Sequence, residues 1–93
     1  MMKIEWTLNA KLQLSEILAY YTRRNGSPSY SKRLKKEIWK VIQHIRKNAH
    51  FGEVVSGYDN RRRTIVGHFV LAYELDKNVV YIHSIRDGRR DEE

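Results

Sequence analysis

The chain has 93 residues, of which 41% are hydrophobic and 31% are charged, and it contains no cysteine. A chain of this length is too short for two separate hydrophobic cores, so we expect one domain spanning residues 1–93. The absence of cysteine excludes disulfides and thiolate metal sites and favours the cytoplasm. The first residues lack the apolar stretch of a signal peptide, and no segment approaches about 18 continuous apolar residues, so no membrane association is expected.

The net charge of +7 is unevenly distributed along the chain. Residues 1–49 carry 11 Lys and Arg against 3 Asp and Glu, whereas residues 50–93 carry 7 against 8. A basic half of this kind attracts nucleic acid, an acidic protein or a nucleoprotein assembly, and charge alone does not choose among them. The alternative interpretation is that the lysines only keep a helix soluble.

The N-terminal segment predicts a short strand followed by a helix. Ile4 and Trp6 alternate with polar neighbours over residues 3–7, a period that is typical of a half-buried strand. Apolar residues at three- and four-residue spacing then predict a helix that is capped by Asn9 and ends at Asn25-Gly26.

A second helix is predicted from Ser27-Pro28 to about Asn48, with Ser27 as its N-cap. Its apolar stripe consists of Tyr30, Leu34, Ile38, Val41, Ile42 and Ile45, with Trp39 at or beside its margin. Lysines and arginines occupy the remaining positions. Because the connection between the helices is short, we expect them to form an antiparallel hairpin.

After Gly52 the apolar period changes from helical to alternating. The predicted strands cover residues 53–55, 63–68, 69–75 and 79–85, the middle two being either one long strand or two strands broken at Gly67. Asp76-Lys77-Asn78 is expected to close a hairpin. Strands that follow a helical hairpin predict an α+β fold with the helices packed on one face of a small antiparallel sheet.

The strand at residues 69–75 is apolar on both sides. Phe69, Leu71, Tyr73 and Leu75 share one face, and Val70 and Ala72 share the other. Because helices cover only one face, we expect a protein partner to cover part of the second.

Two segments carry a family resemblance: GHFVLAY at residues 67–73 and IRDGRRD at residues 85–91. With Trp6, the two helical stripes and the basic Arg61–Arg63, they resemble the RelE/ParE superfamily of type II toxin–antitoxin toxins, the plasmid stabilisation type, along nearly the whole chain. The resemblance implies a helical hairpin on a small sheet. It also implies a cognate antitoxin partner, and neither a cofactor nor a small-molecule ligand.

Two activities are known in that superfamily. ParE-like toxins inhibit DNA gyrase without performing chemistry, and RelE-like toxins cleave mRNA on the ribosome. RelE-like members commonly carry an arginine at the position that Val70 occupies here, and a tyrosine or histidine near the C-terminus, which this chain lacks. The resemblance is therefore closer to ParE. The alternatives are a ribosome-dependent endoribonuclease and a non-toxic relative that only binds its antitoxin.

Histidines are the candidate acid–base groups for the nuclease alternative, because their pKa lies near neutrality. His68 and His83 lie in strands joined by one turn and can approach each other if the strand register allows it, and Arg63 is the candidate from the arginine cluster. Cross-strand packing is the simpler explanation for scattered histidines such as these and His50. No zinc site is expected, because the sequence lacks cysteine and the spacings HxH and HExxH.

Arginines are the stronger candidates for partner binding. We expect Arg61, Arg62, Arg63, Arg86, Arg89 and Arg90 to gather at one sheet edge as a guanidinium cluster for phosphate or carboxylate. A solvated, self-paired tail is the alternative for the last two. We also predict that Phe69, Leu71 and Tyr73 contact the partner.

Overall fold

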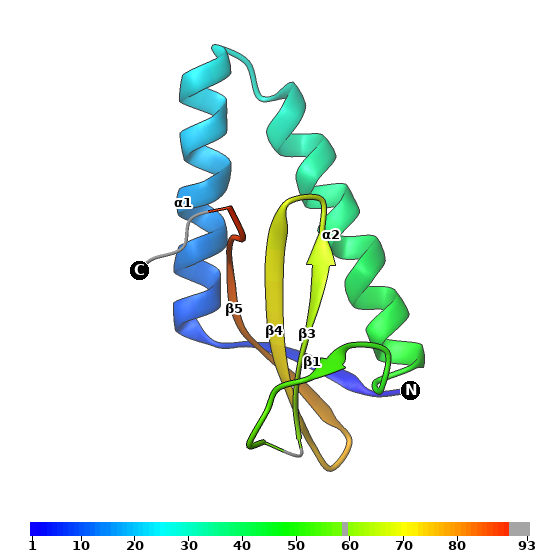
Figure 1. Ribbon diagram of the computed structural model, residues 1–93. Helices are drawn as coiled ribbons and strands as arrows, with labels where there is room; N and C mark the ends of the chain where they lie inside the picture. Colours follow the sequence, from blue (N-terminus) through cyan, green and yellow to red (C-terminus); the bar gives the residue numbers. More distant parts are fainter. Residues whose placement is uncertain (59, 90–93) are drawn as a thin grey trace.

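The computed structural model describes residues 1–58 and 60–89 (Figure 1). Its elements are β1 (Lys3–Trp6), α1 (Leu8–Asn25), α2 (Ser29–Lys47), β2 (Glu53–Val54), β3 (Arg61–Val66), β4 (Phe69–Asp76) and β5 (Val79–Asp87). The two helices form a hairpin whose tip extends beyond the sheet, and the strands lie below and between them (Figure 1). The predicted α+β class is confirmed.

The first helix begins two residues earlier than predicted. Its N-cap is Thr7, whose hydroxyl accepts a hydrogen bond from the Ala10 amide at 3.2 Å, so the assignment of Asn9 as the cap was wrong. Thr7 is extended, as a capping residue requires, whereas Asn9 lies in the first helical turn. The side chain of Asn9 instead donates to the His83 carbonyl at 3.2 Å. Gly26 ends the helix as predicted, in the left-handed conformation at φ 65°.

The start of α2 also differs from the prediction. Pro28, not Ser27, occupies the N-cap position, and it makes no side-chain capping bond. The Ser27 hydroxyl still accepts from the Ser29 amide at 3.2 Å, so it satisfies the first amide of the helix from one residue further out. Proline's fixed φ allows this short entry into the helix.

The five strands form one sheet in the order β1-β5-β4-β3-β2. Neighbouring strands are antiparallel except for β1 and β5, which are parallel with Ile4 opposite Val80 and Trp6 opposite Ile82. The sequence did not reveal this parallel pairing, because β1 joins the last strand of the chain and not its neighbour in sequence. Between β3 and β4, Gly67 adopts φ 64° in a tight turn, so the predicted long segment is two strands.

The core lies between the helices and one face of the sheet. The helical hairpin contributes Ala10, Leu34, Ile38, Ile42 and Ile45, and the sheet contributes Val66, Phe69, Leu71, Tyr73, Val80, Ile82 and Ile85. The stripe predicted for the second helix is therefore confirmed. Trp39 lies outside it, with 61% of its surface exposed.

Tyr73 fixes the loop that connects α2 to β2. Its buried hydroxyl accepts from the Gly52 amide at 2.8 Å and donates to the Ala49 carbonyl at 2.9 Å. Gly52 must be a glycine here, because a Cβ atom would stand 2.7 Å from the Tyr73 hydroxyl. Burial raises the pKa of Tyr73. The two hydrogen bonds of Tyr73 thereby position Phe51 and Gly52, which border the face of the sheet that the helices do not cover.

Candidate functional site

The second face of the sheet, which we call the open face, is not covered by the helices. Its central row consists of Ile65, Val70 and Arg86, which the register aligns across β3, β4 and β5. Here the face is hollowed by about 490 Å³. The hollow is lined by Phe51, Gly52, Glu53, Arg63, Thr64, Ile65, Val70 and Arg86. Ile65 is 63% exposed, and Phe51, which lines the same hollow, is also exposed. Apolar and cationic side chains thus share one shallow surface.

A polar network lies further along the open face. Glu74 Oε1 is 2.8 Å from His83 Nε2 and 3.2 Å from Arg61 Nε. The hydrogen bond from His83 is the main cause that lowers the pKa of Glu74. The guanidinium of Arg61 also stacks 4.4 Å above the ring of Tyr58. A histidine oriented by a carboxylate beside a guanidinium is an arrangement suited to proton transfer at a phosphate.

A second polar group, which we call the C-terminal cluster, consists of Tyr21, His68, Asp87 and Arg89. Asp87 accepts from Arg89 Nη2 at 3.1 Å and lies 3.9 Å from His68 Nε2. Tyr21 connects the same residues, with its hydroxyl 3.4 Å from both His68 Nε2 and Arg89 Nη2. The hydrogen bonds from Arg89 lower the pKa of Asp87 to about 2. These contacts hold the end of β5 against α1.

The pH dependence of stability tests this cluster. Because the folded pKa of Asp87 lies below its ordinary value of 3.8, its charge stabilises the fold near neutral pH, and that contribution is lost as pH falls from about 4 to about 2. We expect Asp87→Asn to flatten the dependence of the urea midpoint on pH in that range. Asp76→Asn, at an exposed aspartate with no ion pair in the described chain, is the control. Parallel curves for the wild type and Asp87→Asn would contradict this role.

Another hollow, which we call the β1 groove, runs between α2 and β1 and has a volume of about 700 Å³. It is lined by Met1, Met2, Lys3, Ile4, Trp6, Leu14, Lys35, Ile38, Trp39, Ile42, Gln43 and Arg46. Its floor is apolar, and Lys35 and Arg46 make one side basic. The groove borders β1, an edge strand of the sheet.

Comparison with known proteins identifies the family of this chain. A family model described as the ParE toxin of the type II toxin–antitoxin system parDE matches residues 4–92. The chain belongs to the ParE toxin family. Its fold resembles a chain from the chromosomal ParDE system of P. aeruginosa, at a TM-score of 0.77 and 20% identity over 94% of this chain and 96% of that one. It also resembles the YoeB dimer from Staphylococcus aureus, at a TM-score of 0.65 and 18% identity over 91% and 94% of the two chains. No curated protein sequence gives a significant match.

The protein is therefore a toxin of the RelE/ParE superfamily, and toxins of type II systems pair with a cognate antitoxin. At identities of 20% and 18%, the two solved structures establish the shared fold. In residues 1–58 and 60–89, no helix is long and apolar enough to cross a membrane. The same residues contain no group of three or more His, Cys, Asp or Glu side chains that could hold a metal ion.

The two candidate histidines of this ParE-family toxin do not meet. His68 lies in the turn before β4 and belongs to the C-terminal cluster, whereas His83 lies on the open face beside Glu74. The reason is the strand register, which places Phe69 opposite Asp87 and shifts between Ala72 and Tyr73, leaving His83 as the extra residue of a bulge. The register on which their approach depended therefore separates these two residues. Glu74 and Arg61 are the partners that sequence reasoning missed for His83.

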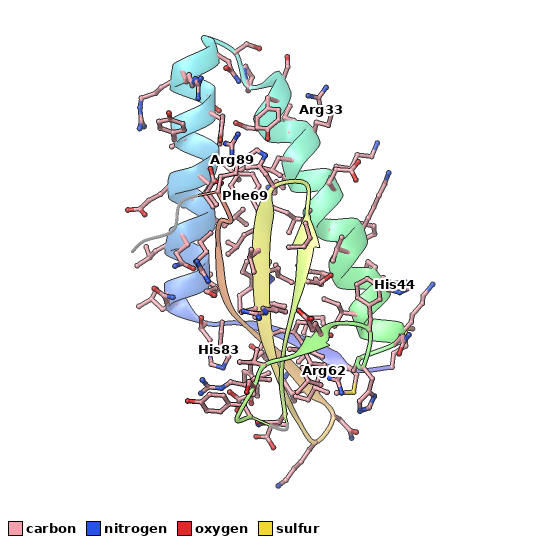
Figure 2. The ribbon with its side chains drawn as sticks, in the orientation of Figure 1. Arg33, His44, Arg62, Phe69, His83 and Arg89 are labelled. Carbon is pink, nitrogen blue, oxygen red and sulfur yellow. The ribbon has the colours of Figure 1, made fainter. Side chains whose placement is uncertain are left out.

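The arginines of the ParE-family toxin do not form the single cluster that we predicted. Arg63 and Arg86 line the hollow of the open face, and Arg61 binds Glu74 in the polar network. Arg62 points to the opposite face, where its Nη1 donates to the carbonyls of His50 and Gly52 at 3.1 and 2.8 Å. Arg89 lies far from Arg62, in the C-terminal cluster (Figure 2). The strand alternation separates consecutive arginines between the two faces. Arg90 lies outside the described residues.

The apolar residues predicted to contact a partner lie in the core of this ParE-family toxin. Phe69, Leu71 and Tyr73 are at most 1% exposed because they face the helices. That prediction is corrected, since the face available to a partner carries Val70 and Ala72 instead. Among the other aromatic side chains, Tyr20, Trp39 and Tyr58 are exposed, whereas Tyr21 packs against Tyr30 and Phe69.

Proposed function

We propose that this ParE-family toxin inhibits DNA gyrase by binding it, without chemistry of its own, and that the open-face hollow contacts the enzyme. The observation that carries the proposal is the central row of the open face, where Val70 lies between the exposed Ile65 and Arg86. RelE-like nucleases commonly carry an arginine at the position of Val70, and a valine cannot stabilise the charge that develops on a phosphate. An exposed apolar centre with arginines beside it is instead typical of protein interfaces.

The alternative function is ribosome-dependent mRNA cleavage, and one observation favours it. His83, Glu74 and Arg61 form a hydrogen-bonded network on the open face, where a general base and a phosphate-binding group would be needed. The likeness to YoeB extends only to the fold. The same network also serves as a cross-strand contact that holds β4 and β5 together.

Single substitutions distinguish these two roles of His83. If the toxin were a nuclease, His83→Ala would lower the rate of message cleavage by about 10²–10⁴-fold, the usual contribution of a general acid or base. Arg63→Ala would lower it as well. His50→Ala is the matched control, because this exposed histidine makes no side-chain hydrogen bond among the described residues. Our proposal predicts that none of these variants changes messenger integrity, measured on translated transcripts with purified ribosomes.

The antitoxin is proposed to bind in the β1 groove. An edge strand presents free backbone N–H and C=O groups that an extended segment can pair with, and the adjacent apolar floor can receive its side chains. Ordering a flexible segment costs several kcal/mol, so the groove must supply substantial apolar burial, which the half-buried Trp6 and the exposed Trp39 offer. Lys35 and Arg46 favour an acidic segment.

Induced expression in bacteria tests the proposed target directly in cells. DNA replication and total protein synthesis would be followed separately by pulse labelling after induction. The proposal predicts that replication stops first and that DNA-damage signalling rises while translation continues. An immediate stop in translation would support the nuclease alternative, and normal growth would leave only antitoxin binding.

A further inference from the structure

Four lysines form a continuous stripe along the outward side of α2. Lys32, Lys36, Lys40 and Lys47 are all exposed and are spaced so that they share one side of the helix, opposite the buried Leu34 and Ile45. The steps between Lys32, Lys36 and Lys40 each advance about 6 Å along the axis, and Lys47 follows about 10 Å further along the same side. Arg33 lies beside this lysine stripe, also on the side of α2 away from the sheet (Figure 2).

Little negative charge offsets the lysine stripe. Glu37 is the one acidic residue of α2, and its carboxylate lies 3.8 Å from Lys40. Within residues 1–58 and 60–89, Lys32, Lys36 and Lys47 have no carboxylate within ion-pair distance. The helix that carries them is firmly held, because Leu34, Ile38, Ile42 and Ile45 are buried along its opposite side. The charges are therefore presented on a rigid support.

We propose that the lysine stripe binds the phosphate backbone of duplex DNA. A row of cations along one side of a helix complements a polyanion whose phosphates lie along a line. The major groove of B-form DNA is wide enough to admit a helix, whereas the major groove of duplex RNA is too deep and narrow for a helix to enter. Binding of single strands would call for several stacking aromatics, and Trp39 is the one exposed aromatic of α2.

Two other polyanions fit the stripe less well. A membrane surface would be bound by a helix with an exposed apolar side, and the apolar side of α2 is buried in the core. The acidic antitoxin segment is assigned to the β1 groove, which Lys35 and Arg46 border but Lys32, Lys36, Lys40 and Lys47 do not. The stripe is thus a separate surface. It also does not depend on the gyrase proposal, because the inference concerns DNA alone.

The salt dependence of binding to a short fluorescent DNA duplex tests the inference with the full chain. Four phosphate contacts predict a slope of about −3.6 for log K against log salt, equivalent to about a 150-fold loss of affinity over a fourfold rise in salt. The triple variant Lys32→Gln, Lys36→Gln, Lys40→Gln should reduce that loss to about 3-fold. The control variant Lys11→Gln, Arg24→Gln, Lys77→Gln removes the same charge from α1 and the β4–β5 turn and should keep the steep slope.

The comparison between the two triple variants decides the outcome. Circular dichroism first establishes that both are folded, which is expected because all six side chains are exposed. Equal loss of affinity in the two variants would overturn the inference, since it would mean that only net charge attracts DNA. Tighter binding to duplex RNA, to single strands or to anionic vesicles than to duplex DNA would overturn it as well.

Discussion

Replacing Tyr73 with phenylalanine is expected to lower the free energy of unfolding by about 2–4 kcal/mol, a large part of the total for a small domain. The substitution removes one hydroxyl and leaves the Gly52 amide and the Ala49 carbonyl without their partner. A buried group left without a hydrogen bond costs about 1–3 kcal/mol. In a domain of this size, the melting temperature should fall by roughly 10–20 °C.

Tyr81→Phe is the matched control for this experiment. Tyr81 lies on the neighbouring strand β5, is half-buried on the open face, and makes no hydrogen bond through its hydroxyl among the described residues. Its loss should change the free energy of unfolding by less than about 0.5 kcal/mol. Equal effects of the two substitutions in urea unfolding would contradict the role of Tyr73 as the anchor of the loop before β2.

The second large effect concerns the antitoxin. Trp39→Ala is expected to weaken antitoxin binding by about 30-fold or more, because a tryptophan buried at an interface commonly contributes 2 kcal/mol or more. Trp39 lines the β1 groove yet is 61% exposed in the free toxin, so its removal should scarcely affect folding. Binding is measured by calorimetry or by surface capture of the antitoxin's toxin-binding segment.

Leu12→Ala is the control for the antitoxin experiment. Leu12 is an exposed apolar residue of α1 that does not line the β1 groove. Its substitution removes exposed apolar surface without touching the proposed interface, so affinity should remain within about 2-fold of the wild type. A larger loss with Leu12→Ala than with Trp39→Ala would place the antitoxin on the outer side of α1 instead.

Three surfaces of this small toxin have distinct compositions. The open-face hollow combines Ile65 with Arg63 and Arg86, the β1 groove combines an apolar floor with an edge strand, and the lysine stripe is almost purely cationic. The first two lie on different sides of the sheet-and-helix core, which allows the antitoxin to act without occupying the proposed gyrase contact.

The helical half of the fold could be predicted from sequence because its signals are local. The stripe of Leu34, Ile38, Ile42 and Ile45 follows the helical period, and Gly26 ends α1 where a left-handed residue is needed. The cap was misplaced by two residues because Thr7 and Asn9 are both good caps by residue type. Only the position of the hydroxyl relative to the Ala10 amide separates them.

The open face could not be predicted because it depends on strand register. Periodicity shows that Phe69, Leu71 and Tyr73 share one face, but it does not show which face the helices cover. The contact between His83 and Glu74 depends on a bulge opposite Ala72 and Tyr73, and a bulge leaves no clear signal in the sequence. The arginines at Arg61–Arg63 appeared to form one cluster because they are consecutive in sequence. The alternation of side chains along β3 places Arg62 on the opposite face.

The most direct test of the proposed function is DNA supercoiling by purified gyrase in the presence of this toxin. The proposal predicts that supercoiling stops at toxin concentrations comparable to the enzyme, that added antitoxin restores it, and that Ile65→Asp abolishes the inhibition while His83→Ala does not. Supercoiling that continues undiminished, at toxin concentrations well above the affinity for the antitoxin, would contradict the proposal.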